Sequence, residues 1–279
     1  MSGPGRVPST GRGEPALTAM GHRSQDAGTG AQTPGEFVMT RLLFGLPSLQ
    51  GKIDNYAKRF DLVELTPVDH ALPKASKLAA WRERVPPAFA FSVVMPKAVA
   101  TLKPGEDFEA ALTESLAAAT ELMARAIVVA TPPSVRPTPR NKQRLVELAA
   151  RIPAEGAHRF WEPSGIWEAN EVMAVASEAG LIPVFDAAQD PLPPGPVVYT
   201  RIRGIGHAAR LGAQRIQSIA EQVRGRREAY LVVDRPIARK VQSGLRAVLA
   251  ADDTRGPVPM LFTPDGDLDL DLDDDDEEQ

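Results

Sequence analysis

Short apolar runs along the chain alternate with longer stretches in which apolar residues recur every three or four positions. The short runs predict eight β-strands, at Arg41–Leu46, Leu62–Leu65, Phe89–Met95, Ala126–Thr131, His158–Glu162, Leu181–Asp186, Val197–Arg201 and Tyr230–Asp234. The longer stretches predict helices at Gln50–Arg59, Lys74–Arg84, Phe108–Met123, Arg140–Arg151, Ala169–Ala179, Ala213–Arg224 and Ile237–Ala250. Successive strands are therefore joined by a helix, except across residues 187–196, which carry no helical pattern.

Repeated alternation of strand and helix predicts an α/β fold with a parallel sheet. Eight such units that close on themselves form a (β/α)8 TIM-type barrel, which is the fold we expect. An open, doubly wound sheet is the alternative. The segment after the first strand, FGLPSLQ at Phe44–Gln50, lacks the glycine fingerprint that such a sheet carries when it binds dinucleotides.

The two ends of the sequence differ from its middle. Residues 1–36 contain eight glycines and four prolines and no apolar periodicity, which predicts a disordered leader. Residues 37–255 hold the predicted barrel, and residues 256–279 are expected to form an acidic disordered tail. The last fifteen residues, 265–279, contain ten carboxylates and no base. A solvated tail is the main interpretation, and a weak contact with the basic loop at Arg201–Arg210 is the alternative.

Composition narrows the classes of function. The chain has no cysteine, which excludes disulfides, thiolate metal sites and a cysteine nucleophile and fits a cytoplasmic protein. No apolar run approaches the roughly 20 residues of a membrane span, so no membrane partner is expected. The net charge of −4 becomes +6 without the ten carboxylates of residues 265–279. This excess is small for a dedicated duplex-DNA binder.

Polar residues follow the predicted strands at their carboxyl ends, where barrel active sites lie. The acidic ones are Glu64, Glu162 and Asp186, and the basic pair is Arg201 and Arg203. One hypothesis is a pocket at the barrel mouth, in which the carboxylates are catalytic candidates and the arginines bind an anion. The other is a layer of ion pairs that closes the barrel.

Aromatic residues and histidines near these strand ends are weaker candidates. Trp161 and Trp167 flank Glu162 and could wall a pocket. His70 lies in the loop after the second strand, where a packed or surface histidine is the more common interpretation. The carboxylates of the three strands, together with His70 or His207, would be compatible with a divalent metal, although no ligand motif supports one.

Several blocks of the sequence, taken in order, resemble the landmarks of the YecE-like family, domain of unknown function 72. The blocks are FDLVELTPVDHALP, RFWEPSGIW, PVFDAAQDP, YTRIRG and AYLVVD, within residues 40–250. The resemblance implies a TIM barrel, without an activity that can be transferred. It also implies that the family's second-strand glutamate falls on Glu64, its Trp-Glu-Pro run begins at Trp161, its sixth-strand aspartate falls on Asp186, and its strand-seven Tyr and Arg fall on Tyr199 and Arg201.

The chain departs from the pattern of this family at the proposed pocket. The lysine expected at the end of the third strand is replaced by Val94, and the histidine expected after the seventh is replaced by Arg203. Arginine binds anions but does not exchange protons near neutral pH. This change favours binding over proton transfer. From the polar residues at the barrel mouth we expect an enzyme acting on a small anionic substrate, such as a phosphorylated or nucleotide-like compound. A diverged barrel that only binds a ligand or a partner is the alternative, and a nucleic-acid-processing enzyme is a third. The sequence does not indicate the oligomeric state.

Overall fold

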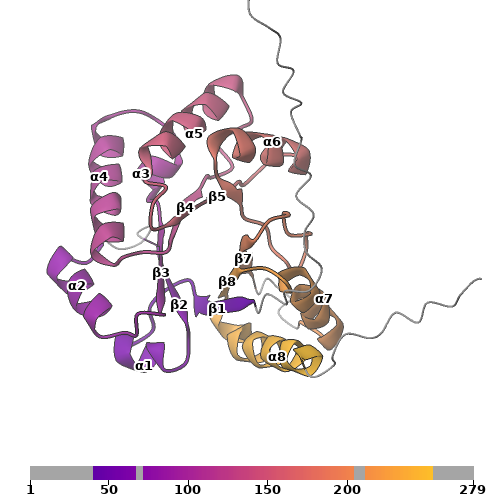
Figure 1. Cartoon of the computed structure of the whole chain (residues 1–279). Helices are drawn as coiled ribbons and strands as arrows, with labels where there is room; N and C mark the ends of the chain where they lie inside the picture. Colours follow the sequence, from indigo (N-terminus) through magenta and orange to yellow (C-terminus); the bar gives the residue numbers. More distant parts are fainter. Residues whose placement is uncertain (1–39, 67–71, 204–210, 254–279) are drawn as a thin grey trace, which may run out of the picture. The chain divides into compact units, whose positions relative to one another are not determined.

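Eight parallel strands form a barrel in the computed structural model, which describes residues 40–66, 72–203 and 211–253 (Figure 1). The strands are β1 (Arg41–Leu46), β2 (Leu62–Leu65), β3 (Ala90–Val94), β4 (Ala126–Ala130), β5 (His158–Glu162), β6 (Ile182–Pro183), β7 (Val197–Ile202) and β8 (Glu228–Val233). They pair in the order β6-β5-β4-β3-β2-β1-β8-β7, and all seven of these pairings are parallel. The TIM-type barrel expected from the sequence is confirmed.

The helices lie outside this sheet and follow the expected order (Figure 1). They are α1 (Ile53–Ala57), α2 (Ala75–Glu83), α3 (Lys97–Ala100), α4 (Glu106–Glu121), α5 (Pro139–Arg151), α6 (Ala169–Ala179), α7 (Ala213–Val223) and α8 (Arg235–Asp253). The short α3 was not expected, because four residues after Pro96 are too few for an apolar period to show. Within the described residues, no helix is long and apolar enough to cross a membrane.

Side chains alternate between the two faces of each strand, so the protein has two hydrophobic cores. Side chains at one set of positions fill the barrel interior, and they include Leu43, Leu62, Phe160, Tyr199 and Tyr230. Side chains at the positions between them, such as Val63 and Trp161, pack between the sheet and the helices. Because side chains alternate with a period of two residues, Glu64, two positions after Leu62, also points inward.

The barrel closes weakly between β6 and β7. The segment just after β6 meets β7 through one isolated bridge, Phe185 with Thr200, and the Ala187 amide donates to Thr200 Oγ1 over 2.9 Å. As expected, no helix follows β6, and prolines at 191, 193, 194 and 196 explain why. Proline lacks the amide hydrogen that a helix or a sheet needs. Strand β6 is shorter than the predicted Leu181–Asp186 because Asp186 already belongs to the turn, where its side chain accepts from the Ala188 amide over 2.9 Å.

Candidate functional site

The polar residues at the carboxyl ends of β2, β5 and β7 meet over the barrel interior. Glu64 on β2 is 2% exposed, and Glu162 at the end of β5 is 8% exposed. Arg201 is the second last residue of β7, two positions after the inward-pointing Tyr199. Each of these side chains therefore lies on the inward face of its strand, at the level where the apolar interior ends.

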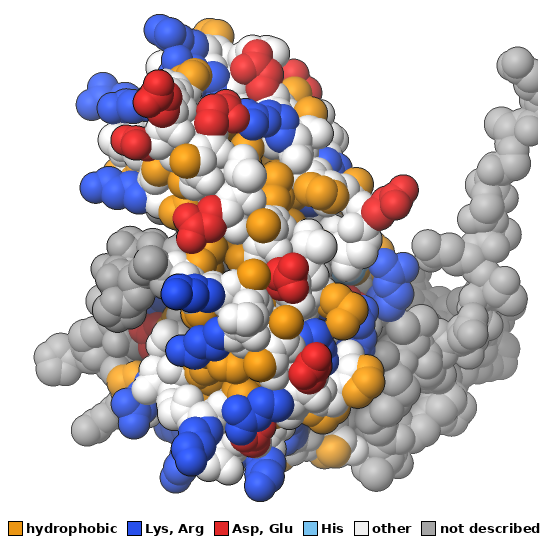
Figure 2. Space-filling view, turned by 90° about the vertical axis from the view of Figure 1, so that its left-hand side faces the viewer, with side chains coloured by type: hydrophobic (Ala, Val, Ile, Leu, Met, Phe, Trp, Pro, Cys, Tyr) orange, Lys and Arg blue, Asp and Glu red, His pale blue; other side chains and the backbone are white. Residues whose placement is uncertain are grey.

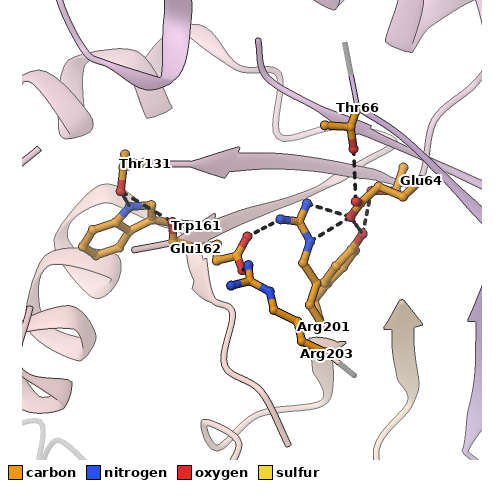
Figure 3. Close-up of polar contacts among 9 residues, drawn as sticks. Glu64, Thr66, Thr131, Trp161, Glu162, Arg201 and Arg203 are labelled. Atoms are coloured by element: carbon orange, nitrogen blue, oxygen red, sulfur yellow. Dashed lines mark hydrogen bonds and ion pairs between the residues drawn. The ribbon is translucent and has the colours of Figure 1, made fainter. Parts of the chain in front are cut away.

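Arg201 joins the two glutamates (Figure 3). Its Nε and Nη2 atoms donate to Glu64 Oε2 over 3.0 and 2.7 Å, and its Nη1 atom donates to Glu162 Oε2. Arg203 Nη2 donates to the other oxygen of Glu162. Burial alone would lower the pKa of Arg201, but the charges of Glu64 and Glu162 outweigh it and raise this pKa. Arg201 is therefore a fixed cation that holds both carboxylates in place.

Further hydrogen bonds fix Glu64 from inside the barrel. The Tyr199 hydroxyl donates to Glu64 Oε2 over 2.6 Å and lies 3.0 Å from Ser92 Oγ. Thr66 Oγ1 donates to Glu64 Oε1 over 3.2 Å. Burial raises the pKa of Tyr199 well above its ordinary value, and the negative charge of Glu64 raises it further. The hydroxyl therefore stays protonated and can donate. Glu64 is thus tolerated in an apolar strand because three side chains satisfy its carboxylate.

A cavity of about 610 Å³ opens beside this network, on the side of β5, β6 and β7. The segment that follows β6 runs along it without a helix, which leaves room between α6 and the end of β7. The lining residues are Glu162, Pro163, Ser164, Gly165, Trp167, Ala169, Asn170, Val172, Met173, Val184, Phe185, Asp186, Gln189, Asp190, Pro191, Leu192, Pro193, Pro194, Arg201 and Arg203. A volume of this size suits a small molecule.

The wall of the cavity combines apolar side chains with a few charged groups. The Arg203 side chain is 48% exposed, whereas that of Arg201 is 14% exposed. The Asp186 carboxylate accepts from its own loop, through the Ala188 amide and through Gln189 Nε2 over 2.8 Å. Glu64 does not appear among the described residues that line the cavity, because it lies behind Arg201.

The other candidates from the sequence lie in different places. Trp161 is fully buried between the sheet and the helices, where its Nε1 donates to Thr131 Oγ1 over 3.1 Å. It does not line the cavity, whereas Trp167, at a ring distance of 4.9 Å from Trp161, does. Tyr199 lies beneath the network. His70 and His207 lie outside the described residues. Among the described residues, no three His, Cys, Asp or Glu side chains are grouped so that they could hold a metal ion.

Sequence reasoning missed part of the cavity wall. Asn170 and Met173 on α6 line it, as do Asp190 and Leu192 after β6. The apolar pattern of α6 shows which side of the helix faces the sheet. It does not show that no helix follows β6 to cover the other side of α6. The proline-rich segment 187–196 was the available signal, since a missing crossover helix uncovers one side of the barrel.

Comparisons with known proteins agree with the barrel fold and identify a family. The family model described as "Protein of unknown function DUF72" matches residues 44–252. A DUF72 family protein from Enterococcus faecalis V583 superposes with a TM-score of 0.61 at 17% identity, covering 76% of this chain and 99% of the other. A DUF72 family protein from Thermotoga maritima MSB8 gives 0.52 at 16% identity, with coverages of 76% and 99%. A D-tagatose 3-epimerase-like protein gives 0.51 at 15% identity, with coverages of 76% and 99%. No curated protein matches the sequence.

Proposed function

The chain belongs to the DUF72 family of proteins of unknown function, and we propose that it is an enzyme that acts on a small anionic compound in the cavity beside β5, β6 and β7. The position of Arg203 carries this proposal. It lies on the cavity wall, is held at one end by Glu162, and keeps about half of its side chain exposed. A guanidinium held in this way binds a phosphate or a carboxylate with little loss of conformational entropy.

The remaining wall suits the body of a hydroxylated compound. Asp190 and Gln189 offer hydrogen-bonding groups beside Asp186, and Trp167 and Met173 provide an apolar side. The first turn of α6 also lines the cavity through Ala169 and Asn170. The N-terminus of a helix favours a negative charge. These features support a sugar phosphate or a nucleotide-like compound whose anionic group contacts Arg203.

The three acidic candidates then take different roles. Asp186 is the best placed to exchange a proton with a ligand, since it lines the cavity and its carboxylate accepts only from its own loop in the contacts described above. Glu162 makes ion pairs with two guanidiniums and orients Arg203. Glu64 acts through Arg201 and is a positioning residue. Asp186 is also the described residue that is best placed to help bind a divalent ion.

A binding protein without turnover is the second candidate. The charges of Glu64 and Glu162 are neutralised by those of Arg201 and Arg203. This is the layer of ion pairs that was the alternative to a pocket in the sequence analysis. Such a layer holds a ligand-binding wall in place without any chemistry. The two candidates differ in whether the bound compound is changed.

The test screens sugar phosphates, nucleoside monophosphates and small carboxylates by thermal shift, and analyses each mixture by mass spectrometry. We expect a phosphorylated compound to raise the melting temperature of the wild type and to be converted. Arg203→Met should abolish the shift. Arg246→Met is the matched control, because Arg246 is also a half-exposed arginine paired with a carboxylate, Asp61, but lies on α8.

Asp186→Asn separates catalysis from binding. The enzyme proposal requires this variant to keep the thermal shift and to lose conversion. Binding without conversion by the wild type would establish the second candidate. A ligand whose shift survives Arg203→Met unchanged would contradict the proposed site.

A further inference from the structure

Helices α8, α1 and α2 carry a strong excess of positive charge on the outside of the barrel. Residues 52–61, 74–84 and 235–253 contain eleven Lys or Arg and five Asp or Glu. We call the exposed cations of these helices the basic flank; they are Lys52, Lys58, Arg59, Lys74, Lys77, Arg84, Arg235, Arg239, Lys240 and Arg246. In Figure 2, Lys and Arg side chains gather over the lower part of the face, where α1 and α2 lie in Figure 1.

Contacts between the helices show that this flank is one surface. Gln242 Nε2 on α8 donates to the Arg59 carbonyl over 2.9 Å, and Arg246 Nη2 lies 3.0 Å from Asp61 Oδ2. Arg84 at the end of α2 pairs with Asp54 on α1. Two of the five acids of these segments are therefore paired with cations of the flank, and basic residues still outnumber acidic ones by six.

Helix α5 also carries an excess of positive charge, with four basic residues and one acidic residue, but Lys142 pairs with Glu171 and Arg151 pairs with Glu109. Helix α4, further round the barrel, carries five acidic residues and no basic one. At the mouth, Arg201 is enclosed by Glu64 and Glu162. A flexible polyanion that samples the whole protein would therefore be attracted to the basic flank and repelled by α4.

We propose that the acidic segment, residues 265–279, docks on the basic flank of its own chain. Its ten carboxylates are opposite in sign to the flank, where basic residues outnumber acidic ones by six. Helix α8, part of the flank, ends at Asp253, and residues 254–264 form the link to the acidic segment. Eleven extended residues span about 36 Å, whereas the 19 residues of α8 extend about 28 Å.

Tethering makes this contact intramolecular. A link of eleven residues is short, and a short link gives an effective concentration in the millimolar range, so that individually weak, exposed ion pairs add up to a populated contact. A docked segment would compete with any other polyanion for the same cations. The proposed consequence is a protein whose basic flank is shielded from nucleic acid and from anionic surfaces at low salt.

The first experiment is zero-length carbodiimide cross-linking of the full chain, followed by peptide mass spectrometry. This reagent joins a carboxylate directly to a lysine amine. We expect peptides of residues 265–279 to be linked to Lys58, Lys77 and Lys240. Lys97 and Lys103 are exposed internal controls beside α4 and should stay unlinked. The yield should not change on dilution and should be lost toward 1 M salt, where charges are screened beyond about 3 Å.

The second experiment measures binding of a fluorescein-labelled (dT)20 oligonucleotide at low salt. A full-length variant in which the ten acidic residues of 265–279 become Asn or Gln should bind about tenfold more tightly than the wild type, because a tethered competitor is removed. Lys58→Gln with Lys77→Gln and Lys240→Gln should remove this difference, whereas Lys97→Gln with Lys103→Gln should preserve it.

Three results would overturn the proposal. They are cross-links that reach Lys97 and Lys103 as readily as the basic flank, cross-links that form only between molecules, and equal oligonucleotide affinity of the wild type and the neutralised variant. Links between molecules would mean that a second copy occupies the flank. None of these results bears on ligand binding in the cavity.

Discussion

At the scale of single residues, Glu64 is the most informative position. Its carboxylate accepts from Tyr199, Arg201 and Thr66, and it lies behind the cavity wall. Glu64→Gln keeps the volume but leaves Arg201, whose side chain is only 14% exposed, with one carboxylate in place of two. Breaking a buried ion pair from one side costs about 3–5 kcal/mol. We expect urea denaturation to show a decrease of this size in the free energy of unfolding. Ligand affinity should fall less, because Glu64 affects the ligand only through the position of Arg201.

The control for this variant is Asp54→Asn, which breaks the exposed pair with Arg84. Exposed pairs contribute about 0–1 kcal/mol. If Glu64→Gln were as mild as Asp54→Asn while ligand binding disappeared, Glu64 would contact the ligand directly, as the sequence first suggested, and the positioning role would be wrong.

At the scale of elements, Gln222 on α7 fixes the segment that takes the place of a helix. Its Oε1 accepts from the Leu192 amide over 2.7 Å, and its Nε2 donates to the Ala187 carbonyl over 3.1 Å. Gln222→Ala removes two hydrogen bonds, each contributing about 0.5–1.5 kcal/mol. We expect faster hydrogen exchange in residues 187–192 and weaker ligand binding. Gln217→Ala, which affects only a bond to Glu221 on the same helix, should change neither. Unchanged exchange in Gln222→Ala would show that the prolines alone hold this wall.

Strands and helices could be predicted because their signal is local. The bounds of β1, β2 and β5 and of α6 agree with the apolar pattern to the residue. The carboxyl ends of the strands also predicted that Glu64, Glu162 and Arg201 would lie near one another. The cavity wall could not be predicted in the same way. Whether Trp161 or Trp167 faces a pocket depends on which side of β5 a helix covers, and that depends on residues 25 positions further along the chain.

At the scale of the whole molecule, a second charged cluster closes the other end of the barrel. Glu228 on β8 is approached by Arg41 Nη1 at 3.1 Å, Arg125 Nη2 at 2.8 Å and His158 Nε2 at 3.3 Å, and Tyr230 donates to it over 2.7 Å. Burial would raise the pKa of Glu228, but the Tyr230 hydrogen bond and the arginines outweigh it and lower this pKa. The cluster joins residues of β1, β5 and β8 with Arg125, which directly precedes β4.

A lowered pKa in the folded state gives a defined pH dependence. Glu228 stabilises the fold above the unfolded-state pKa of about 4.3, and this contribution is lost as the pH falls through its lower folded-state value. Glu228→Gln should therefore lower the free energy of unfolding at pH 7 by about 1–3 kcal/mol. The difference from the wild type should shrink below about pH 4. Urea titrations across this range measure it, and a difference that persists unchanged at pH 3 would show that the charge of Glu228 contributes nothing.

The weak closure between β6 and β7 has a consequence for self-association. The sheet runs from β6 to β7 in hydrogen-bonding order, so these two strands are its edges wherever the single Phe185–Thr200 bridge opens. An exposed edge is a template on which a strand of another molecule can add and start an aggregate. Here β6 is only two residues long and contains Pro183, and the next segment carries four more prolines. The prolines in this segment take the place of a helix and leave room for a ligand. Because proline has no amide hydrogen to donate, they also prevent an incoming strand from pairing with this edge.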